Sequence, residues 1–152
     1  MFDSHCHLTD GRFDEDRAAV LDASFQAGVT RIVTVASNLE DARAAAKLAR
    51  SHAELAGSHA ALWSTAGIHP HEVSETEDAD LAAVRELAAT DPRVVAIGET
   101  GLDYFYDHSP RELQRRWFEA QLEVAAELDL PIVIHTREAE DDTIAVLRNA
   151  PE

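Results

Sequence analysis

Phe2-Asp3-Ser4-His5-Cys6-His7-Leu8 is the stretch that decides the fold of this chain. Successive side chains of an extended strand point to opposite faces, so we expect His5 and His7 on one face and Cys6 on the other. Neutral imidazole nitrogens bind zinc, manganese, iron and cobalt, which makes the two histidines a candidate ligand pair. A His-x-His pair alone is weak evidence, so the other histidines must decide its meaning.

The composition is typical of one globular domain. The chain has 152 residues, of which 45% are hydrophobic and 28% are charged, and this is enough to bury a sizeable core. No apolar run approaches the roughly 20 residues of a membrane span, and the N-terminus carries no basic and apolar leader. The single cysteine, Cys6, cannot form an internal disulfide, and we interpret it as a small buried apolar residue. We therefore predict a cytoplasmic protein with no membrane partner.

The charge balance excludes one class of function. Lysine and arginine number 13 and aspartate and glutamate 29, so the formal net charge is −16. An acidic surface repels phosphate backbones, which excludes a protein that coats DNA through its charge. It does not exclude an enzyme that acts on a nucleic-acid end, because bound divalent cations can supply local positive charge.

Apolar strands alternate with helices along the whole chain. We expect strands at 2–8, 31–36, 62–68, 94–98 and 131–134. We expect helices at 15–27, through the forties, at about 78–89, at 109–128 and at about 139–149. Five strand-then-helix units of about 30 residues predict a parallel sheet with right-handed crossovers. No linker or repeat divides residues 1–152, which we interpret as one domain.

Two of these helices have clear start signals. Asn38 is the expected N-cap of the second helix. The fourth helix combines Ser109 as N-cap, Pro110 at the first helical position and Glu112 for a capping box. Trp117 lies on the apolar face of this helix, and we expect it to pack in the core rather than stack on nucleic-acid bases. The same holds for Phe118.

Polar residues distinguish a barrel from an open sheet. Five of the eight histidines fall at the carboxyl ends of the expected strands, and so does Glu99; these histidines are His5, His7, His69, His71 and His135. In a barrel the strand ends meet at one mouth, whereas an open sheet spreads them along a line. We therefore predict an α/β TIM barrel, (β/α)8, of which this chain holds about five units. The remaining histidines are expected to be ordinary loop residues bonded to backbone carbonyls: His52, His59 and His108.

Four strand-end side chains together indicate a metal site: His5, His7, Glu99 and His135. Four independent coincidences at matching strand ends are much less probable than one shared site. His71 is a weaker candidate.

Four motifs resemble the TatD family of metal-dependent hydrolases. They are Phe2-Asp3-Ser4-His5-Cys6-His7-Leu8, Gly67-Ile68-His69-Pro70-His71, Gly98-Glu99-Thr100-Gly101-Leu102-Asp103-Tyr104 and Pro131-Ile132-Val133-Ile134-His135-Thr136-Arg137. They occur in family order along the full chain. The resemblance implies a metallo-dependent TIM barrel and a divalent-metal deoxyribonuclease, typically a 3′-to-5′ exonuclease. Some members have been linked to other ester substrates, including aminoacyl-tRNA.

The resemblance also implies roles for single residues. His5 and His7 resemble ligands of one metal, and His135 resembles a ligand of a second. Glu99 resembles the carboxylate that bridges both metals at the catalytic centre. A further group resembles mouth residues that orient the ligands or hold a phosphate: His69, Asp103 and Arg137.

Phosphodiester cleavage suits such a centre. Two divalent ions about 4 Å apart (Mg²⁺, Mn²⁺ or Zn²⁺) activate a water and stabilise the entering and leaving oxygens. Arg137 could add a bidentate contact to a terminal phosphate. The expected substrates are DNA ends or oligonucleotides. No Ser-His-Asp or Cys-His order and no glycine-rich phosphate loop argues for another mechanism.

The resemblance is incomplete at one end. Family members have eight βα units, whereas this sequence stops after the fifth helix. The expected ligand histidine of the next strand and the aspartate of strand eight are both absent. We therefore expect the N-terminal part of a TatD-like enzyme, inactive alone and completed by a C-terminal part or by self-association. The alternatives are a hydrolase of another ester or amide, and a non-catalytic metal-binding remnant or assembly subunit.

Overall fold

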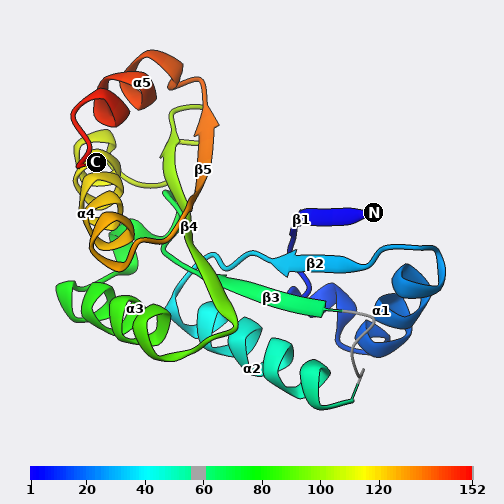
Figure 1. Cartoon of the computed structure of the whole chain (residues 1–152). Coiled ribbons are helices and arrows are strands. Elements are labelled where there is room, and N and C mark those ends of the chain that lie inside the picture. The colour runs from blue at the N-terminus through cyan, green and yellow to red at the C-terminus, as the bar shows by residue number, and fades with distance from the viewer. Residues whose placement is uncertain (56–60, 152) are drawn as a thin grey trace.

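A computed structural model describes residues 1–55 and 61–151. Five βα units follow one another along it (Figure 1). The strands are β1 (Phe2–Cys6), β2 (Arg31–Thr34), β3 (Ala61–Ala66), β4 (Val94–Asp103) and β5 (Ile132–Arg137). The helices are α1 (Arg17–Gln26), α2 (Leu39–Leu55), α3 (Asp78–Thr90), α4 (Arg111–Leu128) and α5 (Glu140–Arg148). Short 3₁₀ helices, η1 (Gly11–Phe13) and η3 (Val73–Glu75), lie in the loops after β1 and β3. The predicted alternation is confirmed.

The five strands form one parallel sheet in the order β1-β2-β3-β4-β5. Each strand pairs with the one before it in the chain, and the sheet curls strongly between β3 and β5 (Figure 1). All carboxyl ends therefore lie along the same rim, as in a barrel. Within the described residues, β1 and β5 each pair with a strand on one side only.

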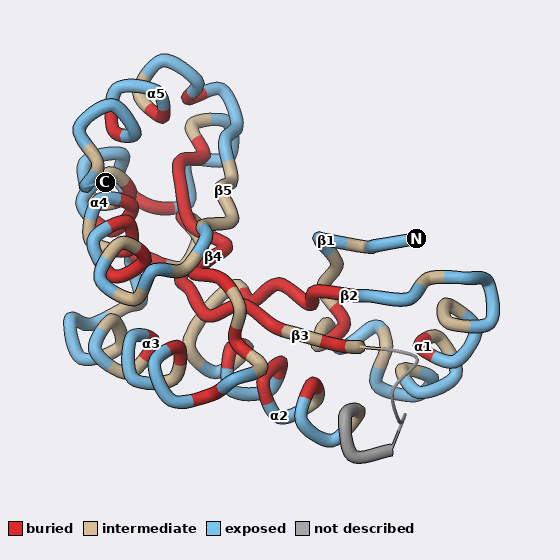
Figure 2. The backbone as a smooth tube through the Cα atoms, in the orientation of Figure 1, coloured by how far each residue is buried: buried red, intermediate tan, exposed pale blue. Residues whose placement is uncertain are grey.

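The core lies between the sheet and the helices that cover its outer face. Figure 2 shows the buried backbone concentrated in the central strands and on the inner sides of α2 and α4. Ile68, Val84 and Ile97 belong to one apolar cluster with Trp117. Trp117 is 4% exposed and Phe118 is fully buried, so the prediction that both pack in the core is confirmed.

Two glycines allow β4 and β5 to approach closely. Gly98 has φ +136°, and a Cβ atom there would lie 2.5 Å from the Val133 carbonyl oxygen. Gly101 has φ +137°, and its Cβ atom would lie 2.0 Å from the His135 carbonyl oxygen. Only glycine fits these positions. Their close approach puts Glu99, which follows Gly98, beside His135.

The fourth strand is longer than predicted. It was expected to end at Gly98, with Glu99 at its carboxyl end, but β4 continues to Asp103. The extension is held by pairing with β5, in which Thr100 faces Ile134 and Asp103 faces Arg137. Glu99 therefore lies inside a strand.

The two predicted helix starts have different outcomes. The Asn38 side chain accepts a hydrogen bond from the Asp41 backbone N–H at 3.0 Å, so the predicted cap of α2 is confirmed. The predicted Ser109 cap of α4 is wrong, because Pro110 occupies the N-cap position and no side chain caps the helix. The Ser109 hydroxyl instead donates to the His71 carbonyl at 3.2 Å. Ser109 thus ties the start of α4 to the loop after β3.

Among the described residues, we find no helix whose length and apolar character would let it cross a bilayer.

Candidate metal centre

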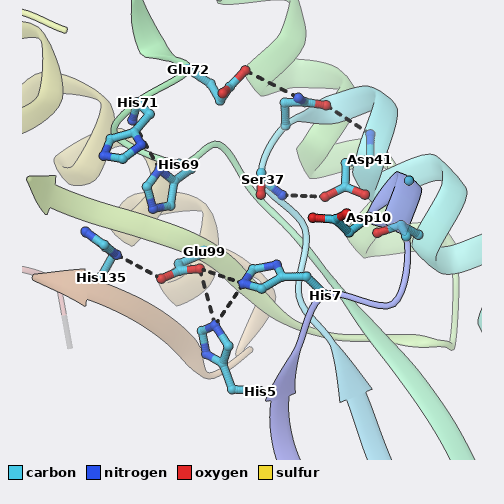
Figure 3. A pocket seen from close by; sticks show the side chains of 13 residues that line it. His5, His7, Asp10, Ser37, Asp41, His69, His71, Glu72, Glu99 and His135 are labelled. Carbon is cyan, nitrogen blue, oxygen red and sulfur yellow. Dashed lines mark hydrogen bonds and ion pairs between the residues drawn. The ribbon is translucent and has the colours of Figure 1, made fainter. Parts of the chain in front are cut away.

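A pocket of about 650 Å³ opens at the carboxyl ends of the strands (Figure 3). Its walls come from β1, β4 and β5 and from the loops after β1, β2 and β3. The lining residues are His5, His7, Thr9, Asp10, Gly11, Ser37, Asn38, Asp41, His69, His71, Glu72, Glu99 and His135. Polar side chains thus gather where a barrel is expected to carry its chemistry.

His5 lies in β1, which ends at Cys6 and not at Leu8 as expected, and His7 directly follows it. The two side chains point to the same side, as the strand alternation predicts. Their Nε2 atoms lie 3.3 Å apart. The Glu99 Oε2 atom lies 3.3 Å from Nε2 of His5 and 3.7 Å from Nε2 of His7 (Figure 3). The Nδ1 atom of His7 lies 2.9 Å from the Val35 carbonyl oxygen. Since a carbonyl only accepts, this contact places the proton of a neutral ring on Nδ1 and leaves the Nε2 lone pair free.

Cys6 lies on the opposite face of the same strand. It is partly buried against the apolar cluster that contains Leu21 and Ile32, and its Sγ atom lies 3.5 Å from the Val33 carbonyl oxygen. Burial raises the pKa of the Cys6 thiol to about 12. The predicted role as an apolar residue behind the strand is supported.

The other oxygen of Glu99 faces a second group of donors. Oε1 lies 3.1 Å from Nδ1 of His135, and the donor atoms of His69, Glu99 and His135 all lie within 4.8 Å of one another. The donor atoms of His5, His7 and Glu99 meet the same limit. The carboxylate of Glu99 therefore stands between two donor groups and offers one oxygen to each.

A third group forms around Asp103. Its Oδ2 atom lies 2.8 Å from Nε2 of His71 and 2.9 Å from Nε2 of His135. Its Oδ1 atom accepts hydrogen bonds from the backbone N–H groups of Phe105 and Tyr106 at 3.1 and 2.8 Å. The carboxylate is fully buried and all its contacts are within the protein. These contacts are those of a side chain that orients its neighbours, and the role of Asp103 stays a prediction.

The surroundings determine the protonation of these groups. Burial alone raises the pKa of Glu99, but the hydrogen bond with His135 and the nearby His69 and His5 bring it below the ordinary value. Burial lowers the pKa of His69 to about 4, so its ring is neutral near pH 7. An ionised carboxylate beside the neutral imidazole of His69 is a donor set that suits divalent cations. The residues therefore fit a divalent metal.

The carboxylate–histidine contacts shift two further groups. The hydrogen bond with Glu99 raises the pKa of His135, against the opposing effect of burial. For Asp103, burial raises the pKa, but the backbone N–H of Tyr106 and the contacts with His71 and His135 outweigh it. The pKa of Asp103 is therefore well below its usual range.

Five of the seven predicted site residues line the pocket, whereas Asp103, which contacts His135, and Arg137 do not. His5, His7, His69, Glu99 and His135 all line the pocket. Arg137 does not line it. Its guanidinium carbon instead lies 4.8 Å from the ring centroids of both Phe105 and Tyr106. The roles of these residues as metal or substrate ligands remain predictions.

Sequence reasoning underrated several residues. His71 joins the third donor group, and the His108 ring lies 4.7 Å from the His71 ring and so belongs to the same rim. The pocket also includes carboxylates that no motif indicated: Asp10, Asp41 and Glu72. Asp10 and Glu72 lie in loops that follow strands, and Asp41 lies in the first turn of α2.

His52 and His59 have other outcomes. His52 was expected in a loop, but it lies in α2 and its ring stacks on Phe25 at 5.0 Å. Its Nε2 atom is buried without a hydrogen-bond partner, and the described part of the chain shows no carbonyl contact for it. His59 lies outside the described residues.

Comparison with known proteins gives consistent matches. Residues 2–152 match the family model described as TatD related DNase. Proteins named 3′-5′ ssDNA/RNA exonuclease TatD from Shigella flexneri serotype 5b (strain 8401) and Escherichia coli (strain K12) are each 42% identical to this chain over 147 residues. Each match covers 97% of this chain and 54% of the relative.

A solved structure agrees with these matches. A TatD homologue from Escherichia coli K12 superposes with a TM-score of 0.85 at 31% identity. The match covers 98% of this chain and 55% of that structure. The chain thus spans about half the length of the relatives it matches.

Proposed function

The chain belongs to the TatD related DNase family, and from this premise we propose that it forms part of the active site of a divalent-metal-dependent nuclease. One observation carries the proposal: the two oxygens of Glu99 face different groups of histidines, His5 and His7 on one side and His135 on the other. A carboxylate in this position is suited to join two cations. The donor groups themselves suit divalent metals.

We assign the donors to two metals. His5, His7 and Glu99 would hold the first, and Glu99, His135 and His69 would hold the second. Mg²⁺, Mn²⁺ and Zn²⁺ are the candidate ions. When bound, such ions polarise a phosphoryl group and lower the pKa of water, which then acts as the nucleophile.

The protein's own contribution is to hold the donors in place. The Val35 carbonyl fixes the tautomer of His7, and Asp103 fixes the ring of His135 from behind. Partners of this kind orient ligands and sustain metal affinity. Because Asp103 also contacts His71, it couples the loop after β3 to β5.

Nucleic-acid ends are the proposed substrate. The family description names a DNase, and the relatives are named as exonucleases of single-stranded DNA and RNA. We propose the same class of substrate and the hydrolysis of terminal phosphodiester bonds. Cytoplasmic location stays a prediction that rests on the single free cysteine, Cys6.

We also propose that other strands complete the barrel. Unpaired strand edges recruit further strands, and β1 and β5 are both edges in the described sheet. A complementary βα segment or a second copy of the chain would cover them. This chain alone is then expected to bind metal weakly and to show no turnover.

A chimera tests the proposal. Residues 1–152 are fused to the remaining part of the Escherichia coli relative, which is 42% identical over the matched region. With Mn²⁺ the chimera should release mononucleotides from single-stranded DNA, and chelator or Glu99→Gln should abolish release.

Two results would contradict the proposal. A folded chimera that binds Mn²⁺ but hydrolyses only amides or other esters would favour the wider hydrolase alternative. A folded chimera that binds Mn²⁺ but hydrolyses no substrate would favour the non-catalytic metal-binding remnant.

A further inference from the structure

Two aromatic side chains stand exposed beside the pocket. Phe105 and Tyr106, in the loop after β4, are 53% and 49% exposed, and their ring centroids lie 4.7 Å apart. Large aromatic side chains dominate core and interface energetics, so an exposed pair indicates an interaction site. The packed aromatic residues of α4, Trp117 and Phe118, do not share this exposure.

The pair is continuous with the donor groups. The Tyr106 ring lies 5.6 Å from the His71 ring, and His71 lines the pocket. The His108 ring stacks on Tyr106 with an interplanar angle of 2°. Asp103 accepts from the backbone of Phe105 and Tyr106 with one oxygen and contacts His71 with the other. One buried carboxylate thus fixes both the aromatic loop and the donor histidine.

A cation accompanies the rings. The guanidinium carbon of Arg137 lies 4.8 Å from both ring centroids, within the range of a cation–π contact. Other arginines, such as Arg85 and Arg111, hold a carboxylate within 4.0 Å. Within the described residues Arg137 has no carboxylate that close, so its charge is available to a phosphate.

We propose that Phe105, Tyr106 and Arg137 form a nucleotide subsite at the rim of the metal centre. The two rings are nearly perpendicular, with an interplanar angle of 86°, so a base of the substrate stacks on one of these exposed rings, and Arg137 takes an adjoining phosphate. The inference rests on the proposed nuclease function and adds to it a subsite that binds a base without sequence preference. Every base offers a π face to such a platform, whereas a base inside a duplex is already stacked on both faces.

The test compares two polymers of equal phosphate charge. One is a fluorescently labelled oligothymidylate, and the other is an abasic oligomer of the same length. The acidic surface repels both equally, so their affinity ratio measures the contribution of the bases. Binding to the 152-residue chain is followed by fluorescence anisotropy with Mn²⁺ present. The ratio does not depend on the fraction of each variant that is folded.

Matched variants then locate the effect. Removal of both rings, in Phe105→Ala/Tyr106→Ala, should lower the affinity for oligothymidylate about tenfold and leave the abasic oligomer unchanged. Tyr106→Phe keeps the ring and should retain the wild-type ratio. Arg137→Ala should weaken both polymers equally. Leu147→Ala and Arg148→Ala, at exposed positions on α5, are the controls and should change neither affinity.

The opposite results are equally clear. If the wild-type chain binds both polymers equally and the double variant does the same, the subsite is overturned, while an active chimera would keep the nuclease proposal intact. If the wild-type chain binds neither polymer and the chimera is inactive, both proposals fall. If the double variant loses affinity for both polymers alike, the aromatic pair serves the loop structure or contact with another protein. This result, too, overturns the subsite.

Discussion

The Nε2 atom of His135 lies 2.9 Å from Oδ2 of Asp103, while Nδ1 of the same ring lies 3.1 Å from Oε1 of Glu99. Both partners are carboxylates, so the ring is held from two sides. The hydrogen bond with Glu99 is the main cause of the raised pKa of His135. Asp103 is itself fixed by two backbone N–H groups. The orientation of His135 is therefore set by the protein.

Replacing Asp103 tests this orienting role. In Asp103→Asn the neutral side chain cannot accept from both histidines and from the backbone of Phe105 and Tyr106. We expect Mn²⁺ affinity to fall about 10- to 100-fold, measured by calorimetric titration. Asp129→Asn is the control, because Asp129 is an exposed C-cap residue with φ 53°, a conformation that asparagine tolerates. Unchanged affinity in Asp103→Asn would show that His135 is held without it.

Replacing Glu99 tests the shared carboxylate. Since Glu99 faces both donor groups, Glu99→Ala should reduce bound metal to background rather than by one ion. Glu123→Ala, on the exposed side of α4, should leave the metal content unchanged. Elemental analysis of the dialysed chimera, in which the barrel is complete, measures both. Equal stoichiometry in the two variants would contradict the assignment of Glu99.

A buried glutamine supports the strand end before His69. The Gln121 side chain accepts from the Ile68 N–H at 2.7 Å and donates to the Ile68 carbonyl at 3.0 Å. Gln121→Leu leaves both groups buried and unpaired, which should lower the free energy of unfolding by about 1–3 kcal/mol. Urea denaturation measures the change.

The exposed Gln26 supplies the control for this prediction. Gln26→Leu makes the same chemical change at the end of α1 and should alter stability by less than about 0.5 kcal/mol. Equal effects of the two substitutions would show that the contacts with Ile68 contribute no stability.

Tyr104 provides a pH-dependent test away from the pocket. Burial, followed by the hydrogen bond that its hydroxyl donates to Asp142 at 2.6 Å, raises the pKa of Tyr104 to about 12. Tyr106→Phe leaves Tyr104 as the only tyrosine. In this variant tyrosinate absorbance should rise near pH 12 in the folded protein, and near pH 10 after unfolding.

The sign of the stability effect follows from this shift. A pKa raised by folding stabilises the protein fully below about pH 10, and the contribution is lost as the pH rises toward about 12. Between these values, Tyr106→Phe should lose more unfolding free energy than a variant that also carries Tyr104→Phe. Ionisation of Tyr104 near pH 10 in the folded state would contradict the prediction.

Local sequence patterns were enough to predict most of the helices and strands and half of the candidate metal centre. Strand alternation alone places His5 and His7 on one face, and apolar runs mark all five strands. Glu99 was expected at a strand end because the apolar run of the fourth strand stops at Gly98. Only the approach of β5 to Gly98 and Gly101 reveals that β4 continues. A single sequence does not encode such a contact locally.

Contacts between loops could not be predicted from local sequence patterns, for the same reason. His71 and Asp103 lie 32 residues apart in the chain and meet because the ends of β3 and β4 share one rim. The Ser109 hydroxyl bonds the His71 carbonyl and not its own helix, although the local sequence matches a cap. The tertiary contact with His71 outweighed the local preference of Ser109 for capping its own helix.

The strand order has a consequence for synthesis. Because each strand pairs with its predecessor, a chain that leaves the ribosome can dock every new βα unit on a surface that already exists. Domains that fold from the N-terminus during translation exploit such short-range pairing. His5 and His7 emerge first, Glu99 joins them when β4 docks, and His135 arrives with β5. The direction of translation is thus also the direction in which the donor set is assembled.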